Sequence, residues 1–243
     1  MNILETTLVR PGGADEPRRF SIERVFNLGS ATRDAAEATH HQKEVADVGV
    51  RIAFDVPAPR IYPMSPTVLT TEDVVHVQSD RTSGEVEIVL VVDGDDIFVG
   101  VGSDHTDRAL ETVSILWSKQ ACPNVLAPVM WRWSDVEEGW DDFDLVCDVD
   151  GAPYQDVKTG IFLSPPEVLQ VLRARTRELP SCYAVFCGTY VSIDGTVRFG
   201  SSWGFGLSDP ASDRRIEHRY DVVNLLEEIR PEFRVPVRGD QED

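Results

Sequence analysis

Short runs of apolar residues, broken at close intervals by polar and turn-forming residues, predict a chain that is mostly β. Strands are expected where β-branched and aromatic residues cluster, because these side chains suit a pleated, half-buried surface. Such runs occupy residues 20–28, 74–77, 85–92, 97–101, 143–149, 154–157, 183–186, 189–193, 196–199 and 203–207. The turn residues 94–96 and 151–153 predict two hairpins, whereas residues 218–229 are compatible with a strand or a helix.

Helical patterns are fewer. Residues 31–48 are rich in Ala, Glu, His and Gln, contain no Gly or Pro, and predict a helix that ends near Gly49. Residues 106–118 also have helical character, and residues 166–179 place their apolar side chains mainly on one side, as an amphipathic helix does. The pattern as a whole predicts an α+β fold that is mostly β.

Four prolines between residues 56 and 66 divide the chain. Proline fixes φ and removes an amide donor, so this stretch predicts an extended, irregular connection. We therefore expect an N-terminal arm with a helix over residues 1–66, a main β domain over 67–237 and a disordered tail over 238–243.

Charge limits the possible partners. The 243 residues include 23 Lys and Arg against 42 Asp and Glu, which gives a formal net charge of −19. So negative a field argues against binding to nucleic acid or to an anionic membrane. An anionic substrate would need a local positive charge, for which a metal ion is the obvious candidate.

Composition also predicts a location. No apolar run approaches the roughly 18 residues of a membrane span, and residues 1–10 lack the apolar region of a secretory signal. The four cysteines are scattered and form no C-x-x-C pair, which favours reduced thiols over a zinc site. We expect a cytoplasmic protein.

Two glutamates at the start of a predicted strand are the first candidate for chemistry. Glu85 and Glu87 point to the same face, because strand side chains alternate. A solvated strand face is the simpler interpretation of such a pair. The functional one is a hard divalent cation such as Mg²⁺ or Mn²⁺, held by carboxylate oxygens. The next strand would return Asp104 towards this pair, although Asp104 could instead cap the following helix.

Three further residues suggest a reaction. Lys119 is one of only three lysines in the chain, and its compact ammonium is suited to stabilising an enolate or a carboxylate. His41 and Glu44 stand three residues apart on the predicted helix, where the carboxylate could orient the imidazole as a general base for water. A surface lysine and a surface ion pair are the simpler alternatives, and His40 is a competing histidine.

The order of these features resembles the fumarylacetoacetate hydrolase superfamily. That resemblance extends over roughly residues 20–220 and is nearest to an uncharacterised bacterial branch, similar to the superfamily's C-terminal catalytic domain. The segments that carry it are His41 with Glu44, the proline-rich link, Glu85 with Glu87, residues 103–108, Lys119, residues 150–159 and residues 188–190. Each motif is weak alone, but their order runs through nearly the whole chain.

The resemblance implies a mixed β-sandwich roll with flanking helices and an N-terminal arm. It implies that the main domain carries a metal centre for Mg²⁺ or Mn²⁺, with Glu85, Glu87 and Asp104 as ligands. Lys119 would contact substrate oxygens beside the metal. The helix of the arm would be a lid that carries His41 and Glu44 and activates water on closing.

The resemblance also implies the lining of the pocket. Gln155 and Thr189 would line it, and Arg108 would bind the substrate or support the groups that do. Relatives in this superfamily are commonly dimers, so a homodimer is expected. Three positions depart from the family pattern: Ser103 replaces an asparagine, Tyr190 replaces a proline, and the lysine of an F-x-K-P segment is missing near residues 62–66.

The function that follows is a divalent-metal-dependent hydrolase that cleaves C–C bonds of 2-oxo or 1,3-dicarbonyl acids through a metal-stabilised enolate. A lyase in the same fold is an alternative, either a 2-oxo acid decarboxylase or a dehydratase or hydratase acting on a sugar-derived 2-oxo acid. A non-catalytic small-molecule binding protein is a second alternative.

Overall fold

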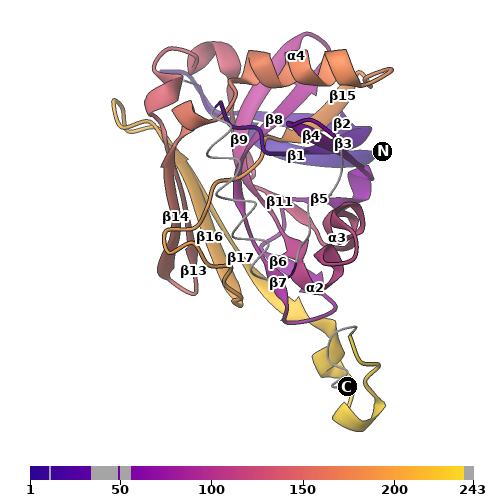
Figure 1. The fold of residues 1–243 in the computed structure, drawn as a ribbon. Helices are drawn as coiled ribbons and strands as arrows, with labels where there is room; N and C mark the ends of the chain where they lie inside the picture. The colour runs from indigo at the N-terminus through magenta and orange to yellow at the C-terminus, as the bar shows by residue number, and fades with distance from the viewer. Residues whose placement is uncertain (11, 34–48, 50–55, 238–243) are drawn as a thin grey trace.

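The computed structural model describes residues 1–10, 12–33, 49 and 56–237, and these residues form two packed β-sheets with a few short helices (Figure 1). The larger sheet has ten strands, with a main path in the order β2-β1-β12-β9-β8-β15-β3-β4 and with β11 and β5 attached beside β9. The smaller sheet has five strands in the order β14-β13-β16-β17-β6. The fold is α+β and mostly β, as the sequence predicts.

The strands of the larger sheet are β1 (Asn2–Leu8), β2 (Glu16–Ile22), β3 (Arg24–Gly29), β4 (Arg60–Met64), β5 (Leu69–Thr70), β8 (Val86–Asp93), β9 (Asp96–Asp104), β11 (Asn124–Leu126), β12 (Val129–Arg132) and β15 (Cys182–Phe186). Those of the smaller sheet are β6 (Val74–Val77), β13 (Asp144–Val149), β14 (Ala152–Lys158), β16 (Ser202–Ser208) and β17 (Arg215–Asn224). A two-stranded ribbon joins β7 (Thr82–Ser83) to β10 (Thr106–Asp107).

The β8–β9 hairpin is the centre of the molecule. Strand β8 lies between β9 and β15, and all its residues except Asp93 are buried because both faces of the sheet are covered. Its residues alternate between two cores: Val86, Ile88, Leu90 and Val92 pack towards the smaller sheet, whereas Val89 and Val91 pack on the opposite face. Residues 85 and 87 therefore share the second face, as the sequence alternation predicts.

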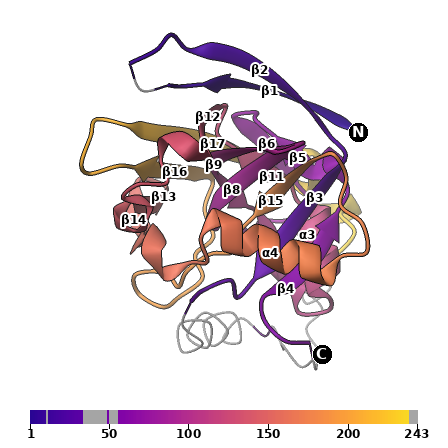
Figure 2. The same cartoon turned by 90° about the horizontal axis from the view of Figure 1, so that it is seen from above.

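Within the described part of the chain, three α-helices accompany the sheets: α2 (Arg108–Glu111), α3 (Ile115–Ala121) and α4 (Pro165–Arg175). Helix α4 matches the predicted amphipathic segment, and Figure 2 shows it running along the outside of the sheets. Its Val168, Leu169 and Leu172 are buried in the main hydrophobic core. The predicted helix over residues 106–118 is instead divided, because Ser114 caps the start of α3 through its hydroxyl. No helix among the described residues is long and apolar enough to cross a membrane.

The predicted strands at 189–193 and 196–199 are wrong. This segment is an irregular loop in which the Asp194 carboxylate accepts hydrogen bonds from the backbone amide and the hydroxyl of Thr196. Such local side-chain bonds offer the backbone an alternative to strand pairing. The segment 218–229 continues β17 as far as Asn224 and then forms a single 3₁₀ turn, Leu225–Glu228.

The first 66 residues supply strands β1 to β4, all within the larger sheet. Most of the helix predicted for residues 31–48 lies outside the described residues, and so does the predicted tail over 238–243. The division of the chain at residue 66 stays a prediction.

Close packing at Gly102 yields a test of the hairpin. A Cβ added at Gly102 would lie 2.5 Å from the Val125 carbonyl oxygen, whereas one at Gly100 would meet only side-chain atoms, the nearest 3.3 Å away on Met130. Backbone cannot give way as a methionine can, so Gly102→Ala is expected to lower the free energy of unfolding by about 1–3 kcal/mol. Chemical denaturation measures this loss, and Gly100→Ala is the matched control. Equal losses in the two variants would contradict the close contact between Gly102 and the Val125 carbonyl.

Candidate metal centre

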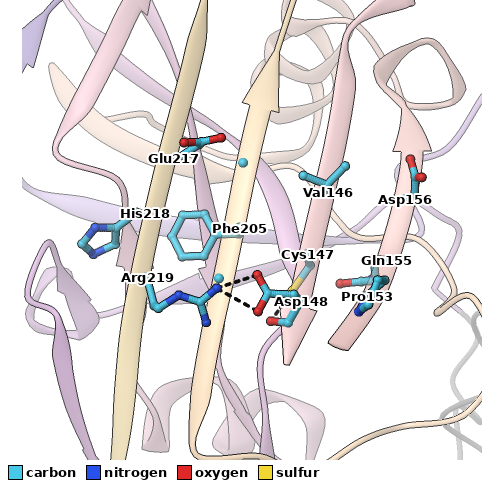
Figure 3. Close-up of a pocket in the computed structure, with 12 residues that line it drawn as sticks. Val146, Cys147, Asp148, Pro153, Gln155, Asp156, Phe205, Glu217, His218 and Arg219 are labelled. Carbon is cyan, nitrogen blue, oxygen red and sulfur yellow. Dashed lines mark hydrogen bonds and ion pairs between the residues drawn. The ribbon is translucent and has the colours of Figure 1, made fainter. Parts of the chain in front are cut away.

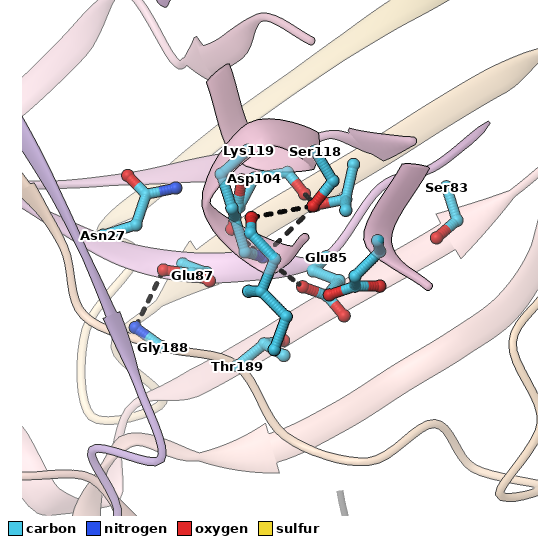
Figure 4. Close-up of polar contacts among 12 residues, drawn as sticks. Asn27, Ser83, Glu85, Glu87, Asp104, Ser118, Lys119, Gly188 and Thr189 are labelled. Carbon is cyan, nitrogen blue, oxygen red and sulfur yellow. Dashed lines mark hydrogen bonds and ion pairs between the residues drawn. The ribbon is translucent and has the colours of Figure 1, made fainter. Parts of the chain in front are cut away.

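Three carboxylates meet at the end of the β8–β9 hairpin. Each of Glu85, Glu87 and Asp104 offers an oxygen, and these oxygens lie within 4.8 Å of one another (Figure 4). The hairpin brings them together: Glu87 pairs with Gly102, and the Asp104 amide donates to the Glu85 carbonyl at 3.0 Å. The three side chains are buried, with exposures of 4%, 2% and 1%. The interpretation of this pair as a solvated strand face is therefore wrong.

Burial and mutual repulsion act on this cluster. Burial raises the pKa of Glu87 well above its usual range, and the negative charge of Asp104 raises it further. Burial likewise raises the pKa of Asp104, which the ammonium of Lys119 offsets in part. The Glu87 carboxylate also accepts a hydrogen bond of 2.8 Å from the Gly188 amide. Both carboxyl groups therefore resist ionisation in this site, mainly because they are buried.

Lys119 on α3 reaches into the cluster. Its ammonium donates to Asp104, to Glu85 Oε2 at 3.5 Å and to Thr106 Oγ1 at 3.2 Å. Burial by itself lowers the pKa of Lys119, but Asp104 and Glu85 outweigh it and raise the pKa above its usual value. Lys119 is therefore a permanent cation here and is unsuited to act as a base.

Arg108, at the start of α2, lies behind Glu85. Its guanidinium is 1% exposed and donates to Glu85 Oε1 at 2.6 Å, to Glu111 Oε2 at 2.7 Å and to Ser83 Oγ at 2.6 Å. It is absent from the residues that line the cavity in front of the carboxylates. Through these contacts Arg108 holds the carboxylate of Glu85 in place, and its role in substrate binding stays a prediction.

Gln155 and Thr189 both form hydrogen bonds with Val86, the residue between Glu85 and Glu87. Gln155 Oε1 accepts from the Val86 amide at 3.0 Å, and its amide group donates to Thr189 Oγ1 at 2.9 Å. The Thr189 hydroxyl in turn donates to the Val86 carbonyl at 2.8 Å. Thr189 lines the cavity itself, whereas Gln155 holds Thr189 and the start of β8 in place.

The residues present fit a hard divalent cation. The buried cluster contains four carboxylates, those of Glu85, Glu87, Asp104 and Glu111, against two cations, Arg108 and Lys119. Two positive charges would balance the ionised cluster. In addition, Asp104 Oδ1 is buried and has no hydrogen-bond partner among the described residues. Carboxylate oxygens in this number are the ligands that Mg²⁺ and Mn²⁺ prefer.

The structure adds residues that the sequence did not indicate. A small cavity of about 50 Å³ in front of Glu85 and Glu87 is also lined by Ser30, Arg60, Tyr62 and Glu111. Arg60 and Tyr62 are two positions apart on β4 and so share a face of that strand. The alternation of these two residues is a sequence signal for the site, but the prolines around them favour an irregular connection instead.

A second groove, of about 670 Å³, lies on the outer face of the smaller sheet (Figure 3). Its floor includes Gly204 and Gly206, and the Arg219–Asp148 ion pair crosses it at 2.8 Å. It is larger than the cavity at the carboxylates, but the one cluster of potential metal ligands found among the described residues is Glu85, Glu87 and Asp104. We therefore take the smaller cavity as the candidate site. His41 and Glu44 lie outside the described residues.

Comparison with solved structures shows the same fold in several enzymes. The chain matches a fumarylpyruvate hydrolase from Pseudomonas aeruginosa, solved with Mn²⁺ and pyruvate, at 17% identity and a TM-score of 0.62, covering 90% of this chain and 96% of the other. A 5-carboxymethyl-2-hydroxymuconate delta-isomerase from Mycobacterium smegmatis matches at 17% identity and a TM-score of 0.61, covering 87% and 86%. The yeast protein ynq8, of the fumarylacetoacetate hydrolase family, matches at 14% identity and a TM-score of 0.61, covering 84% and 94%.

Comparison with curated proteins gave no match. The model of one family does match, over residues 29–220, and its description is "Protein of unknown function (DUF2848)". That match includes every residue of the candidate centre described above. The chain therefore belongs to the DUF2848 family and has the fold of the fumarylacetoacetate hydrolase superfamily.

Proposed function

We propose that this protein is a divalent-metal-dependent hydrolase that cleaves C–C bonds in 2-oxo or 1,3-dicarbonyl acids. The observation that carries the proposal is the buried triad of Glu85, Glu87 and Asp104 beside Lys119. Supporting it, a fumarylpyruvate hydrolase of the same fold was solved with Mn²⁺ and pyruvate. A purely structural core has little reason to bury three adjacent carboxylates, since each resists desolvation.

In this proposal Glu85, Glu87 and Asp104 would hold Mg²⁺ or Mn²⁺. When bound, such a cation supplies Lewis-acid chemistry, drawing electron density from a substrate carbonyl. Lys119 would contribute a second, fixed positive charge beside the same substrate oxygens. Its hydrogen bonds to Asp104 and Thr106 hold the ammonium in position, so little reorganisation is needed as charge develops.

Arg60 would bind a carboxylate of the substrate. With a divalent cation in place the buried cluster is close to neutral, and Arg60 is the one further cation in the lining of the cavity among the described residues. A guanidinium there would attract an anionic substrate into a protein whose overall field repels it. Tyr62, on the same face of β4, would present its hydroxyl to the same ligand.

Hydrolysis also needs an activated water. His41 would act as the general base for this water, with Glu44 orienting the imidazole on a closing lid. Without such a base the same centre would suit a lyase, because decarboxylation can proceed without an activated water. Homodimerisation stays a prediction alongside these roles.

Metal binding is tested by thermal melting with and without Mn²⁺. The cation should stabilise the wild type by about 2.7 kcal/mol when its free concentration is about 100 times Kd. Glu87→Gln should abolish that shift, and should leave the melting temperature of the metal-free protein unchanged or higher, because Gln keeps an acceptor for the Gly188 amide and removes a buried carboxyl group. The exposed control Glu5→Gln should respond as the wild type does. A full Mn²⁺ shift in Glu87→Gln would contradict the ligand assignment.

The role of Arg60 is tested by steady-state kinetics with an acylpyruvate such as fumarylpyruvate. Arg60→Ala should raise KM about tenfold to a hundredfold, because a hydrogen bond to a charged group contributes about 1.5–3 kcal/mol. The control is Arg24→Ala, an exposed arginine on β3. An unchanged KM in Arg60→Ala would exclude this residue from substrate binding.

The reaction class is tested with His41→Ala and two substrates, an acylpyruvate and oxaloacetate. Hydrolysis of the acylpyruvate should be lost, because no base remains to activate water, while any decarboxylation of oxaloacetate should persist. His76→Ala, an exposed histidine on β6, is the control. Hydrolysis at the wild-type rate in His41→Ala would remove this residue from the proposal.

A further inference from the structure

A chain of hydrogen bonds lies behind the carboxylates, on the opposite face of β9 from Asp104. The Glu85 amide donates to Ser103 Oγ at 3.2 Å, and Ser103 Oγ lies 2.9 Å from the Tyr220 hydroxyl. The same hydroxyl lies 2.9 Å from His105 Nδ1. This series of hydrogen bonds therefore begins at the backbone of one candidate ligand, Glu85, and ends at His105, the residue next to another candidate ligand, Asp104.

Counting donors gives this chain a direction. If Tyr220 donates to His105 Nδ1, Ser103 can donate to the Tyr220 oxygen and accept from the Glu85 amide, so that each hydroxyl gives one hydrogen bond and receives one. Only the Nε2 proton of His105 then lacks a partner, and that atom indeed has none among the described residues. The reverse direction would leave the Ser103 proton unpaired as well. The first arrangement is favoured, because unpaired buried polar groups destabilise a fold.

The surroundings leave these groups little freedom. Ser103, His105 and Tyr220 are each 0% exposed. The imidazole of His105 meets the rings of Trp203 and Tyr220 edge to face, with centroids 6.1 Å and 5.6 Å away. A Cβ added at Gly84, the residue before Glu85, would lie 2.6 Å from the Tyr220 oxygen and 2.8 Å from Ser103 Oγ. The tyrosine hydroxyl thus lies against the backbone that leads into Glu85.

Tyr220 comes from the other sheet. It lies on β17, whereas Glu85 and Asp104 lie between the end of the β8–β9 pairing and the start of the short β7–β10 ribbon. Asp104 also pairs with Asn124 on β11, within the larger sheet. Metal binding requires its ligands to keep a fixed separation, and Tyr220 adds to these backbone contacts a connection from the smaller sheet.

We propose that Tyr220 is a positioning residue of the metal centre, which sets the separation of Glu85 and Asp104 through Ser103 and His105. This inference rests on the proposed function, because it requires that the carboxylates bind a cation. Groups that orient metal ligands without touching the metal commonly change metal affinity when they are altered, by about 10–100-fold. Tyr220 touches neither metal nor substrate in this scheme.

The test compares the affinity of two tyrosine variants for Mn²⁺ by titration calorimetry. Tyr220→Phe removes only the hydroxyl and should weaken Mn²⁺ binding about tenfold or more. Tyr183→Phe is the matched control, since Tyr183 is a buried tyrosine on β15 whose ring packs on Phe26, away from the carboxylates. It should bind Mn²⁺ within about twofold of the wild type. The electron paramagnetic resonance spectrum of bound Mn²⁺ should also change in Tyr220→Phe alone, because the geometry of the ligands changes.

A double-variant cycle tests the route of the effect. Ser103→Ala should weaken Mn²⁺ binding as Tyr220→Phe does, and the two changes together should cost less than the sum of their separate effects, because they interrupt one chain. If circular dichroism shows that Tyr220→Phe does not fold, Ser103→Ala carries the affinity test alone, with the same expected loss.

The outcomes separate the two proposals. A wild type that does not bind Mn²⁺ overturns the proposed function. A wild type that binds Mn²⁺, with Tyr220→Phe binding it equally well, overturns the positioning role and leaves the proposed function standing. Equal weakening in Tyr220→Phe and Tyr183→Phe also overturns the positioning role, because the loss would then reflect general packing.

Discussion

The rest of this site depends on one constraint, which is the repulsion among carboxylates buried side by side. Glu85, Glu87 and Asp104 are almost completely shielded from water, and the charges of Asp104 and Glu85 make the ionisation of Glu87 less favourable, as the charge of Glu85 does for Asp104. Lys119 and Arg108 offset part of this repulsion through direct contacts with Glu85. A deficit of positive charge remains in the ionised cluster, and a divalent cation is the simplest group that would remove it.

The fold satisfies this constraint from several directions. The β8–β9 hairpin brings the carboxylates together. Helix α3 carries Lys119, which contacts Asp104 and Glu85, and helix α2 carries Arg108, which contacts Glu85. The smaller sheet contributes Gln155 and Tyr220. Gln155 accepts a hydrogen bond from the first residue of β8, and the Tyr220 hydroxyl lies beside Ser103 and His105, on either side of Asp104. The opposite face of β8 is an uninterrupted apolar surface packed against the smaller sheet. The larger sheet thus carries the charged side chains, and the smaller sheet supports the backbone that carries them.

Sequence patterns located some parts of this site better than others. The alternation at Glu85 and Glu87 predicted their shared face, because the period of a strand depends only on local geometry. The turn at residues 94–96 predicted the hairpin that returns Asp104 to them. The sequence pattern does not indicate Arg60 and Tyr62, because the prolines around them favour an irregular connection. They lie in a strand, β4, that is stabilised by its pairing with β3. The β-branched residues at 189–199 predict strands, whereas the structure has a loop, because the hydrogen bonds that Asp194 makes with Thr196 are not visible in a pattern of residue types.

By itself, the sequence determined what depends on neighbours along the chain: a mostly β fold, the central hairpin, the amphipathic helix α4 and the set of residue types that suits a divalent cation. Only the tertiary structure decided which of the many acidic residues are buried together and that the cations Lys119 and Arg108 contact them. It also decided that Tyr220, from a strand distant in the sequence, lies beside Ser103 and His105. The physical reason is desolvation. A carboxylate in water and one held against two others look identical in a sequence, and only burial among specific partners gives the second its chemistry.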